Sequence, residues 1–275
     1  MKKQSEFTAI IVAAGTGKRM NSSVKKQYME LAAQPVLAMT LKAFEKSDVD
    51  EVVVVTGEDE VSYVREQIVE EFCIKKVVAI CAGGRERCDS VYEGLKQIIK
   101  RYQMESGFQD DRSGAEQSAG DAKGYVLIHD GVRPLITPEL INSCIESVKK
   151  YGACIPGVPE KDTVKEADDE MQVLRTPDRK KMYRIQTPQC FKLSLIKEAF
   201  EKYYQGKPAG ENDKCVDDER DGLCGSAGIT DDAMLVEKYT GHKIKIIEGD
   251  YKNIKITTPD DLGIAEYYIK HRDKV

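Results

Sequence analysis

Two cationic side chains, Arg19 and Lys26, follow closely after an apolar run near the amino terminus. The run Thr8–Val12 is succeeded by Ala13-Ala14-Gly15-Thr16-Gly17-Lys18-Arg19 and then by Lys25-Lys26-Gln27-Tyr28. Small residues leave room for backbone N–H groups to close around a triphosphate, and the two cations can stabilise the charge that grows during phosphoryl or nucleotidyl transfer. The pattern predicts a buried strand that ends in a nucleotide-binding loop.

Neither of the two common glycine motifs fits this loop. A Walker loop needs a glycine where Val12 stands and a Ser or Thr where Arg19 stands. The dinucleotide fingerprint needs a third glycine at Met20 and an acidic residue about 20 positions further on, whereas Glu58-Asp59-Glu60 comes much later. A dehydrogenase is therefore disfavoured, and a plain turn after a strand is the alternative that the loop alone leaves open.

Two later segments place polar and charged residues where further strands are predicted to end. The loop Gly83–Ser90 leads into a predicted helix, which makes a place for a base and ribose or for an anion, although a capped turn explains much of it. The run His129–Arg133 follows the next strand. Asp130 and Arg133 would be costly to bury unpaired, so together they indicate a site.

The elements that must position these residues follow an alternating pattern. Short β-rich runs are separated by helical patterns, which predicts an α/β fold with a Rossmann-like, doubly wound, mostly parallel sheet. The predicted strands are Ala9–Val12, Val52–Thr56, Val77–Ile80, Tyr125–His129, Ala153–Val158 and Ile244–Ile247. An amphipathic helix is predicted after Pro35, a second over Val91–Tyr102, and a last one from the N-cap Thr258 to about His271.

Three segments interrupt the alternation. Residues 104–123 and 205–228 are rich in Gly, Ser and Asp with few apolar anchors, so we expect loop insertions in a single domain that spans residues 1–275. Residues 159–184 contain two short β patterns around the turn Asp168-Asp169-Glu170, which predicts a β-hairpin arm. A lone hairpin is marginal in water, so we expect the arm to pack on a second subunit in a homodimer.

Composition narrows the class of protein. The net charge of −5 argues against a general nucleic-acid binder. No run of about 18 apolar residues exists, and the first residues lead into a strand, so we expect no membrane association and a cytoplasmic location. Six of the eight cysteines lie in apolar patterns typical of small core residues, whereas Cys215 and Cys224 lie in a polar stretch.

The ordered motifs resemble a known family. Ala-Ala-Gly-Thr-Gly-Lys-Arg-Met, Lys-Gln-Tyr, Gly-Gly-Arg-Glu-Arg-Cys-Asp-Ser-Val, His-Asp-Gly-Val-Arg-Pro, Lys-Asp-Thr-Val-Lys, Gln-Thr-Pro-Gln-Cys-Phe, Thr-Asp-Asp-Ala and Asn-Ile-Lys-Ile-Thr-Thr-Pro-Asp-Asp-Leu stand in the order found in the 2-C-methyl-D-erythritol 4-phosphate cytidylyltransferases. The resemblance covers nearly the whole chain outside the two insertions. Lys25 departs from it, because relatives often carry proline there.

The resemblance implies a role for each matching residue. It implies a CTP pocket formed by Ala13, Ala14, Gly15, Gly17, Gly83, Gly84, Arg87, Ser90 and Asp130. It implies an acceptor site formed by Asp130, Arg133, Thr163, Arg179, Thr187, Thr230 and Lys255. Arg19, Lys26, Arg179 and Lys255 are the implied catalytic cations, and Mg²⁺ is expected to be held mainly by the CTP phosphates, with no protein ligand assigned. In the family the arm reaches into the neighbouring subunit's site.

The function implied is the joining of CTP and methylerythritol phosphate to give CDP-methylerythritol and pyrophosphate. A cytidylyltransferase acting on ribitol 5-phosphate and a non-catalytic nucleotide-binding regulator are the alternatives. Three of the residues also have simpler interpretations. Lys255 can be an outward-facing lysine of a strand, Arg179 can be part of a solvated charged surface, and Thr230 can be the N-cap of a helix.

Overall fold

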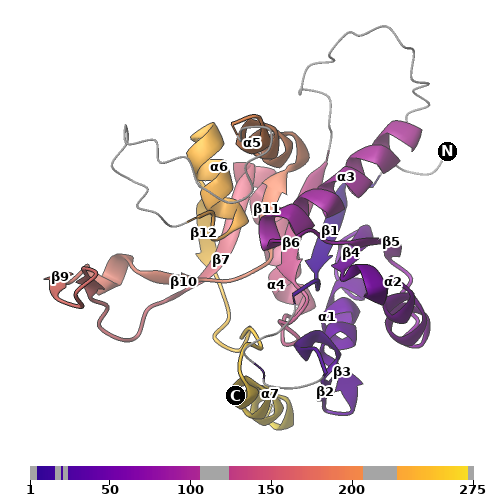
Figure 1. The fold of residues 1–275 in the computed structure, drawn as a ribbon, viewed down its shortest axis with the longest axis horizontal. Helices are drawn as coiled ribbons and strands as arrows, with labels where there is room; N and C mark the ends of the chain where they lie inside the picture. The colour runs from indigo at the N-terminus through magenta and orange to yellow at the C-terminus, as the bar shows by residue number, and fades with distance from the viewer. Residues whose placement is uncertain (1–4, 16–19, 21–23, 106–123, 207–227, 272–275) are drawn as a thin grey trace, which may run out of the picture.

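A computed structural model describes residues 5–15, 20, 24–105, 124–206 and 228–271. Its centre is a mixed sheet in which four parallel strands stand in the order β6 (Tyr125–Asp130), β1 (Phe7–Val12), β4 (Glu51–Thr56), β5 (Val77–Ala82) (Figure 1). All six predicted strands are present, with ends shifted by at most two residues. The predicted α/β class with a mostly parallel sheet is confirmed.

The other half of the sheet contains antiparallel strands that the sequence pattern did not indicate. Strand β11 (Gln189–Lys192) lies between β6 and β7 (Ala153–Pro159) and is antiparallel to both. The short β10 (Tyr183–Ile185) is also antiparallel to β7, whereas β12 (Lys245–Glu248) is parallel to it. The two unpredicted strands, β10 and β11, are three and four residues long, which is too short for a period of two to stand out.

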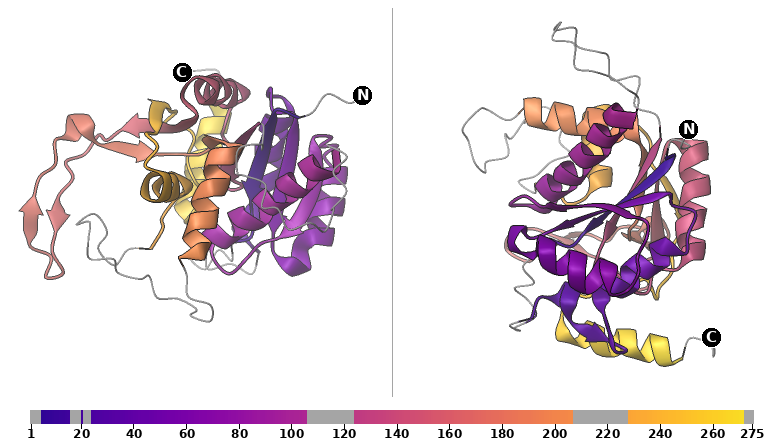
Figure 2. Two further views of the ribbon diagram at one scale, coloured as in Figure 1. Left: turned by 90° about the horizontal axis from the view of Figure 1, so that it is seen from above. Right: turned by 90° about the vertical axis from the view of Figure 1, so that its right-hand side faces the viewer.

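Helices cover both faces of the sheet. One face packs against α1 (Val36–Glu45), α4 (Pro138–Tyr151) and a helical segment formed by η3 (Glu58–Glu60), α2 (Val61–Tyr63) and the π-helical η4 (Val64–Glu70). The other face packs against α3 (Arg87–Glu105), α5 (Leu193–Gln205) and α6 (Asp232–Thr240). Figure 2 shows the two helical layers with the sheet between them.

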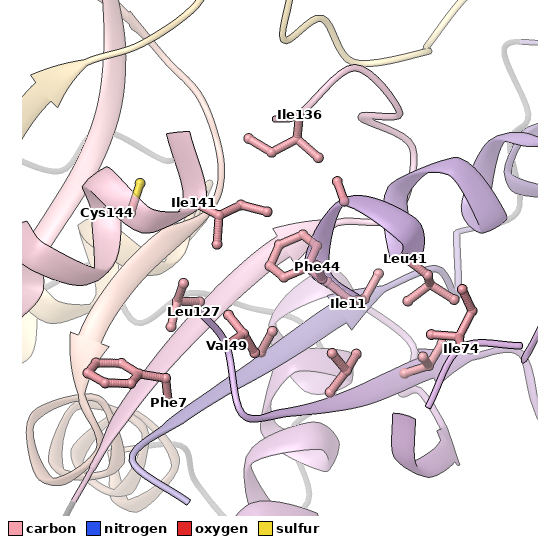
Figure 3. Packing of buried hydrophobic residues seen from close by; sticks show 14 of the residues in the cluster. Phe7, Ile11, Leu41, Phe44, Val49, Ile74, Leu127, Ile136, Ile141 and Cys144 are labelled. Atoms are coloured by element: carbon pink, nitrogen blue, oxygen red, sulfur yellow. The ribbon is translucent and has the colours of Figure 1, made fainter. Parts of the chain in front are cut away.

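Alternation along the central strands builds both cores. Ile11 of β1 lies in a cluster with Phe44 and Leu127, whereas its neighbour Ile10 points to the opposite face and packs in the cluster of α3. Figure 3 shows the first cluster, in which Phe44 of α1 reaches toward Ile11 and Ile141. Because these side chains are fully or almost fully buried, the edge of the sheet that carries the loops is held in a fixed frame.

A third, smaller cluster lies beside the main sheet. Helix α7 (Pro259–Lys270) contacts the hairpin of β2 (Glu30–Leu31) and β3 (Gln34–Pro35), away from the sheet itself (Figures 1 and 2). Its start is confirmed as predicted, because Thr258 is the N-cap and Pro259 is the first helical residue. The cluster also buries Met20, Val132 and Ile256, three residues from loops that border the candidate site.

The predicted arm is present. Strands β8 (Glu166–Ala167) and β9 (Val173–Arg175) form a small antiparallel hairpin, followed by η6 (Arg179–Lys181), and the segment projects away from the sheet in both Figure 1 and Figure 2. Met171, Val173 and Leu174 are 84%, 59% and 61% exposed. Within the described part of the chain, these three apolar side chains of the arm are therefore largely exposed.

Three local expectations are corrected. Helix α3 begins at Arg87 rather than Val91, so Arg87 and Ser90 lie in its first turn. Lys255 lies in an irregular segment rather than a strand. The Ile256 N–H donates to Val132 O beside it, but this contact does not continue as a ladder of strand hydrogen bonds. The N-cap of α6 is Asp231, whose side chain accepts from the Met234 N–H, and not Thr230.

Several expectations lie partly or wholly outside the described residues. These concern most of the two insertions and the thiols Cys215 and Cys224. Of the other cysteines, Cys88, Cys144, Cys154 and Cys190 are buried as expected, whereas Cys73 is exposed and Cys81 is intermediate. Among the described helices, none is both long and apolar enough to cross a membrane.

Candidate active site

The chemistry-bearing loops meet at one edge of the sheet. The carboxyl ends of β1, β4, β5 and β6 lie there, and backbone bonds tie the residues that follow them together. The Ala13 N–H donates to Val55 O (2.7 Å), the Gly83 N–H to Thr56 O (2.8 Å), and the Gly131 N–H to Val12 O (2.8 Å). In open parallel sheets, ligands bind in the crevice outside the carboxyl ends of the strands.

The predicted CTP loops approach each other closely. A Cβ at Gly83 would lie 2.7 Å from the Cβ of Ala14 and 2.6 Å from Ser90 Oγ, and a Cβ at Gly84 would lie 2.2 Å from the Cβ of Asp89. Only glycine therefore fits at either position. Ser90 is buried in the loop, where its Oγ accepts from the Gly84 N–H (3.2 Å) and donates to Glu86 O (3.0 Å). The structure brings Ala14, Gly83, Gly84 and Ser90 together.

Gln27 shapes the first loop. Its side chain is 1% exposed, and its amide Nε2 donates to Ala13 O (2.7 Å) and Gly15 O (3.1 Å). Both carbonyls are thereby drawn toward the protein, which fixes the described part of the loop, Ala13 to Gly15. Gly17 and Arg19 lie outside the described residues, so their predicted roles stay predictions.

A hydrogen-bonded chain fastens the segment that carries Lys26 to the end of β4. The hydroxyls of Tyr28 and Thr56 lie 2.8 Å apart, and the Thr56 hydroxyl donates to the Glu60 carboxylate (3.2 Å). Lys25 Nζ lies 2.7 Å from the same carboxylate. Burial raises the pKa of Glu60, but Lys25 and the surrounding donors outweigh it and lower the pKa overall. Lys25 therefore anchors η2 (Lys26–Tyr28) to Glu60.

Asp130 lies at the centre of the charged groups. Its carboxylate is nearly buried, and its Oδ2 is 2.9 Å from Lys255 Nζ and 3.4 Å from Arg133 Nε. Its Oδ1 is 3.4 Å from Arg87 Nε. The predicted residues Arg87, Asp130, Arg133 and Lys255 are thus brought together from β6, the loop after it, α3 and the segment before α7.

The pKa shifts follow from this arrangement. Burial raises the pKa of Asp130, but Lys255, Arg87 and Arg133 together hold it well below its ordinary value. Burial lowers the pKa of Arg133, and Asp130 only partly opposes this. Asp130 therefore remains ionised and keeps three cations gathered at the strand ends, where a phosphate group could replace or join the carboxylate as their counter-ion.

Thr187 is held by three residues of its own chain. Its Oγ1 accepts from the Asp130 N–H (3.1 Å) and lies 2.9 Å from Nδ1 of the buried His129, and its carbonyl accepts from Asn253 Nδ2 (3.0 Å). Asn253 O in turn accepts from Arg133 Nη1 (2.7 Å). Thr187 is therefore next to Asp130, as predicted, but its side chain supports the strand ends.

Other predicted acceptor residues lie apart from this cluster within the chain. Thr163 and Arg179 are exposed on the projecting arm, and Arg179 Nη1 donates to Lys161 O (2.9 Å). Thr230 is exposed, and its hydroxyl donates to Met234 Sδ (3.6 Å), two residues before the buried Asp232. Their predicted contacts with an acceptor need a ligand or a second subunit.

The sequence did not single out Gln27, Asn253 and Asp232. All three stand inside the motifs quoted above. What distinguishes them is that their polar side chains are buried, and the sequence alone does not show burial. Asp232 Oδ2 lies 2.7 Å from Arg87 Nη2, so the carboxylate joins the charged cluster from helix α6. A polar residue flanked by predicted functional residues is the only sequence signal that could have identified them.

The doubly wound sheet, the two close-packed glycine loops and the cations at the strand ends define a nucleotide-handling α/β protein. A sequence model described as 2-C-methyl-D-erythritol 4-phosphate cytidylyltransferase matches residues 7–104 and 112–271. Relatives of that name from Lachnospira eligens and Alkaliphilus oremlandii are 43% and 42% identical, over 96% and 99% of this chain and 99% and 98% of theirs.

A solved structure agrees with the sequence comparison. The crystal structure of 4-diphosphocytidyl-2C-methyl-D-erythritol synthase from Anaerococcus prevotii is 32% identical, covers 97% of this chain and 96% of its own, and has a TM-score of 0.71. The chain belongs to the 2-C-methyl-D-erythritol 4-phosphate cytidylyltransferase family. The resemblance drawn from the motifs is confirmed.

Proposed function

We propose that the chain transfers the cytidylyl group of CTP to the phosphate of 2-C-methyl-D-erythritol 4-phosphate, with release of pyrophosphate. Family membership over nearly the whole chain supports this assignment. The observation that carries it in the structure is the Asp130 cluster, in which three cations meet beside the glycine loops.

The chemistry follows from charge. A phosphate monoester has a second pKa of about 6 and is mostly dianionic at neutral pH, so the attacking oxygen needs no general base. The main obstacle is repulsion between this dianion and the triphosphate. Lys26, Arg19 and Lys255 offset that repulsion and hold the attacking oxygen, the α-phosphorus and the leaving pyrophosphate in line.

The bond changes balance without another reactant. An oxygen of the acceptor phosphate forms a bond to the α-phosphorus, the bond from the α-phosphorus to the bridging oxygen breaks, and pyrophosphate leaves with the electron pair. The cations near the strand ends stabilise the negative charge that spreads over the transferring group. Arg133 and Lys255 share Asp130 Oδ2, which supports the proposal that they take a phosphate oxygen as a further partner.

Mg²⁺ is proposed to be held mainly by the CTP phosphates. Asp130 already has three cationic partners, and across the ranges that the structure describes no group of three His, Cys, Asp or Glu side chains is placed to hold a metal ion. This donor set fits an ion that takes most of its ligands from phosphate and water, as Mg²⁺ commonly does. When bound, the ion neutralises part of the triphosphate charge.

The proposal includes a homodimer in which each active site is shared. The exposed apolar residues of the arm support this, because isolated hairpins are marginal in water and Met171, Val173 and Leu174 are largely exposed in the described part of the chain. Thr163 and Arg179 then reach the acceptor in the neighbouring subunit's site. A cytoplasmic location is part of the same proposal and is supported only by the sequence.

An acceptor screen tests the assignment. Pyrophosphate release is measured with CTP, Mg²⁺ and either methylerythritol phosphate or ribitol 5-phosphate. We expect turnover with methylerythritol phosphate and at least about tenfold less with ribitol 5-phosphate, which is a difference of about 1.4 kcal/mol in the barrier. Turnover with ribitol 5-phosphate alone would overturn the assignment, and CTP binding without turnover on either acceptor would favour a regulator.

Lys26 provides the variant that tests the mechanism. Lys26→Ala is expected to lower turnover by about a hundredfold or more while the melting temperature stays near that of the parent chain, because the lost contact acts in the transition state. Exposed Lys270 on α7, whose Nζ lies 3.4 Å from Glu266, is the matched control, since Lys270→Ala removes the same charge far from the strand ends. Equal turnover in the two variants would remove Lys26 from the mechanism.

A further inference from the structure

Helix α6 contributes a buried carboxylate that has no assigned role. Asp232 is the first residue of α6 and is 2% exposed. Its Oδ2 lies 2.7 Å from Arg87 Nη2. Burial raises the pKa of Asp232, and Arg87 is the cation that opposes this. A carboxylate buried at this cost and aimed at one guanidinium is not explained by capping, because Asp231 already caps the helix.

The end of α6 is itself fixed on the sheet. Gln189 of β11 is buried, and its Nε2 donates to Asp231 Oδ2 (2.9 Å) while its Oε1 accepts from the Ala233 N–H (2.9 Å). The residues on either side of Asp232 are thereby held to β11. Asp232 therefore presents its carboxylate from a fixed position, and Arg87 must orient toward it.

The orientation of Arg87 determines which oxygens of Asp130 remain for the other cations. Arg87 uses Nη2 for Asp232 and Nε for Asp130 Oδ1 (3.4 Å). Lys255 and Arg133 both lie against the other oxygen, Oδ2. Without Asp232, the guanidinium of Arg87 would be free to bind both oxygens of Asp130. Lys255 would then lose its contact with Asp130 Oδ2.

We propose that Asp232 is a positioning residue, which acts through Arg87 to keep Asp130 Oδ2 and Lys255 aligned at the acceptor side of the site. The pair also links the start of α3, on the predicted CTP side, to the start of α6, which follows Thr230 on the predicted acceptor side. This inference rests on the proposed function for its catalytic consequence, but the geometry that it describes exists without substrate.

The test compares Asp232→Asn with Glu237→Gln. Glu237 is exposed on the same helix, so its variant removes the same charge without touching Arg87. We expect Asp232→Asn to lower kcat by about 10- to 100-fold, because the reacting groups are then misaligned. The dissociation constant for CTP should not rise, because the site gains net positive charge. Glu237→Gln is expected to keep both values within about twofold.

A double-mutant cycle with Arg87→Gln separates positioning from general damage to α6. If Asp232 acts through Arg87, then Asp232→Asn lowers kcat by less than about threefold when Arg87 is already replaced. Additive losses in the two variants, or a weaker CTP affinity with a kcat like the parent's, would overturn the proposal.

A structural measurement distinguishes failure of this inference from failure of the proposed function. In a ligand-free crystal structure of Asp232→Asn, we expect Arg87 to turn onto both oxygens of Asp130 and the Lys255 Nζ to Asp130 Oδ2 distance to exceed its present 2.9 Å. Unmoved Arg87 and Lys255 would refute the inference. Absence of turnover in the parent chain would refute the proposed function and leave this structural result to stand or fall by itself.

Discussion

Replacing Asp130 by asparagine removes the counter-ion that holds three cations at the strand ends. The carboxylate side chain is 8% exposed, whereas those of Arg133, Arg87 and Lys255 are 11%, 28% and 38% exposed. Removing one partner of a buried ion pair costs about 3–5 kcal/mol, since the remaining charge is left uncompensated. Lys255 is screened by solvent, so we expect the lower end, about 3 kcal/mol of unfolding free energy.

The thermal shift follows from the size of the chain. For domains of about this length, 1 kcal/mol corresponds to a change in melting temperature of about 2–4 °C, so Asp130→Asn is expected to melt about 6–12 °C below the parent. Calorimetry in low-phosphate buffer measures this. Added pyrophosphate should raise the melting temperature more in the variant than in the parent, because an anion then binds cations that Asp130 no longer occupies.

Asp50 provides the matched control for the anion effect. Its Oδ2 accepts from the Glu6 and Phe7 N–H groups (2.8 and 2.9 Å) at the opposite, amino-terminal edge of the sheet. Asp50→Asn should therefore show the same pyrophosphate increment as the parent. A melting temperature of Asp130→Asn within about 2 °C of the parent, or an equal pyrophosphate increment in all three proteins, would refute the reasoning.

Three further predictions concern the loop, the buried histidine and the arm. Gln27→Leu removes two hydrogen bonds to the carbonyls of Ala13 and Gly15, so it should lower the free energy of unfolding in urea by about 1–3 kcal/mol and weaken CTP binding. A stability equal to the parent's would show that these bonds do not stabilise the loop. Burial lowers the pKa of His129 from 6.5 to about 3, so the unfolded chain takes up the proton first as the pH falls, and the free energy of unfolding should fall by about 1.4 kcal/mol per pH unit below pH 6.5. In urea titrations at several pH values, His129→Gln should lose this part of the pH dependence, and an unchanged slope would count against a neutral histidine. Leu174→Glu on the arm should shift the chain toward a monomer in light-scattering measurements, whereas a dimer as stable as the parent would show that the arm is not the interface.

The sequence predicted the frame of the fold because long signals support it. The strands β1, β4 and β6 are largely apolar runs, and each stops at or just before an alanine, glycine or acidic residue. The start of α7 is marked by the N-cap Thr258 and by Pro259. Both patterns are local, so no tertiary information is needed to see them. Strand β11 has no comparable signal, because its four residues take their register from β6 and β7.

The candidate site was predictable where residue type and strand end coincide. Asp130, Arg133 and Lys255 were singled out and lie together, although Lys255 arrives on an irregular segment rather than a strand. Asp232 and Gln27 could not be singled out, because their importance depends on contacts with residues 145 and 12 or 14 positions away. Contacts between residues so far apart in the sequence, and the burial that they cause, exist only in the folded chain.

The most direct test of the central claim is a structure of the chain with CTP bound. The account predicts that the triphosphate lies between the loop after β1 and the Asp130 cluster, with Lys26 Nζ within about 4 Å of a phosphate oxygen. Lys255 or Arg133 should face the position from which an acceptor phosphate attacks. A nucleotide bound elsewhere, or phosphates that leave Lys26 and the Asp130 cluster without contact, would contradict the account.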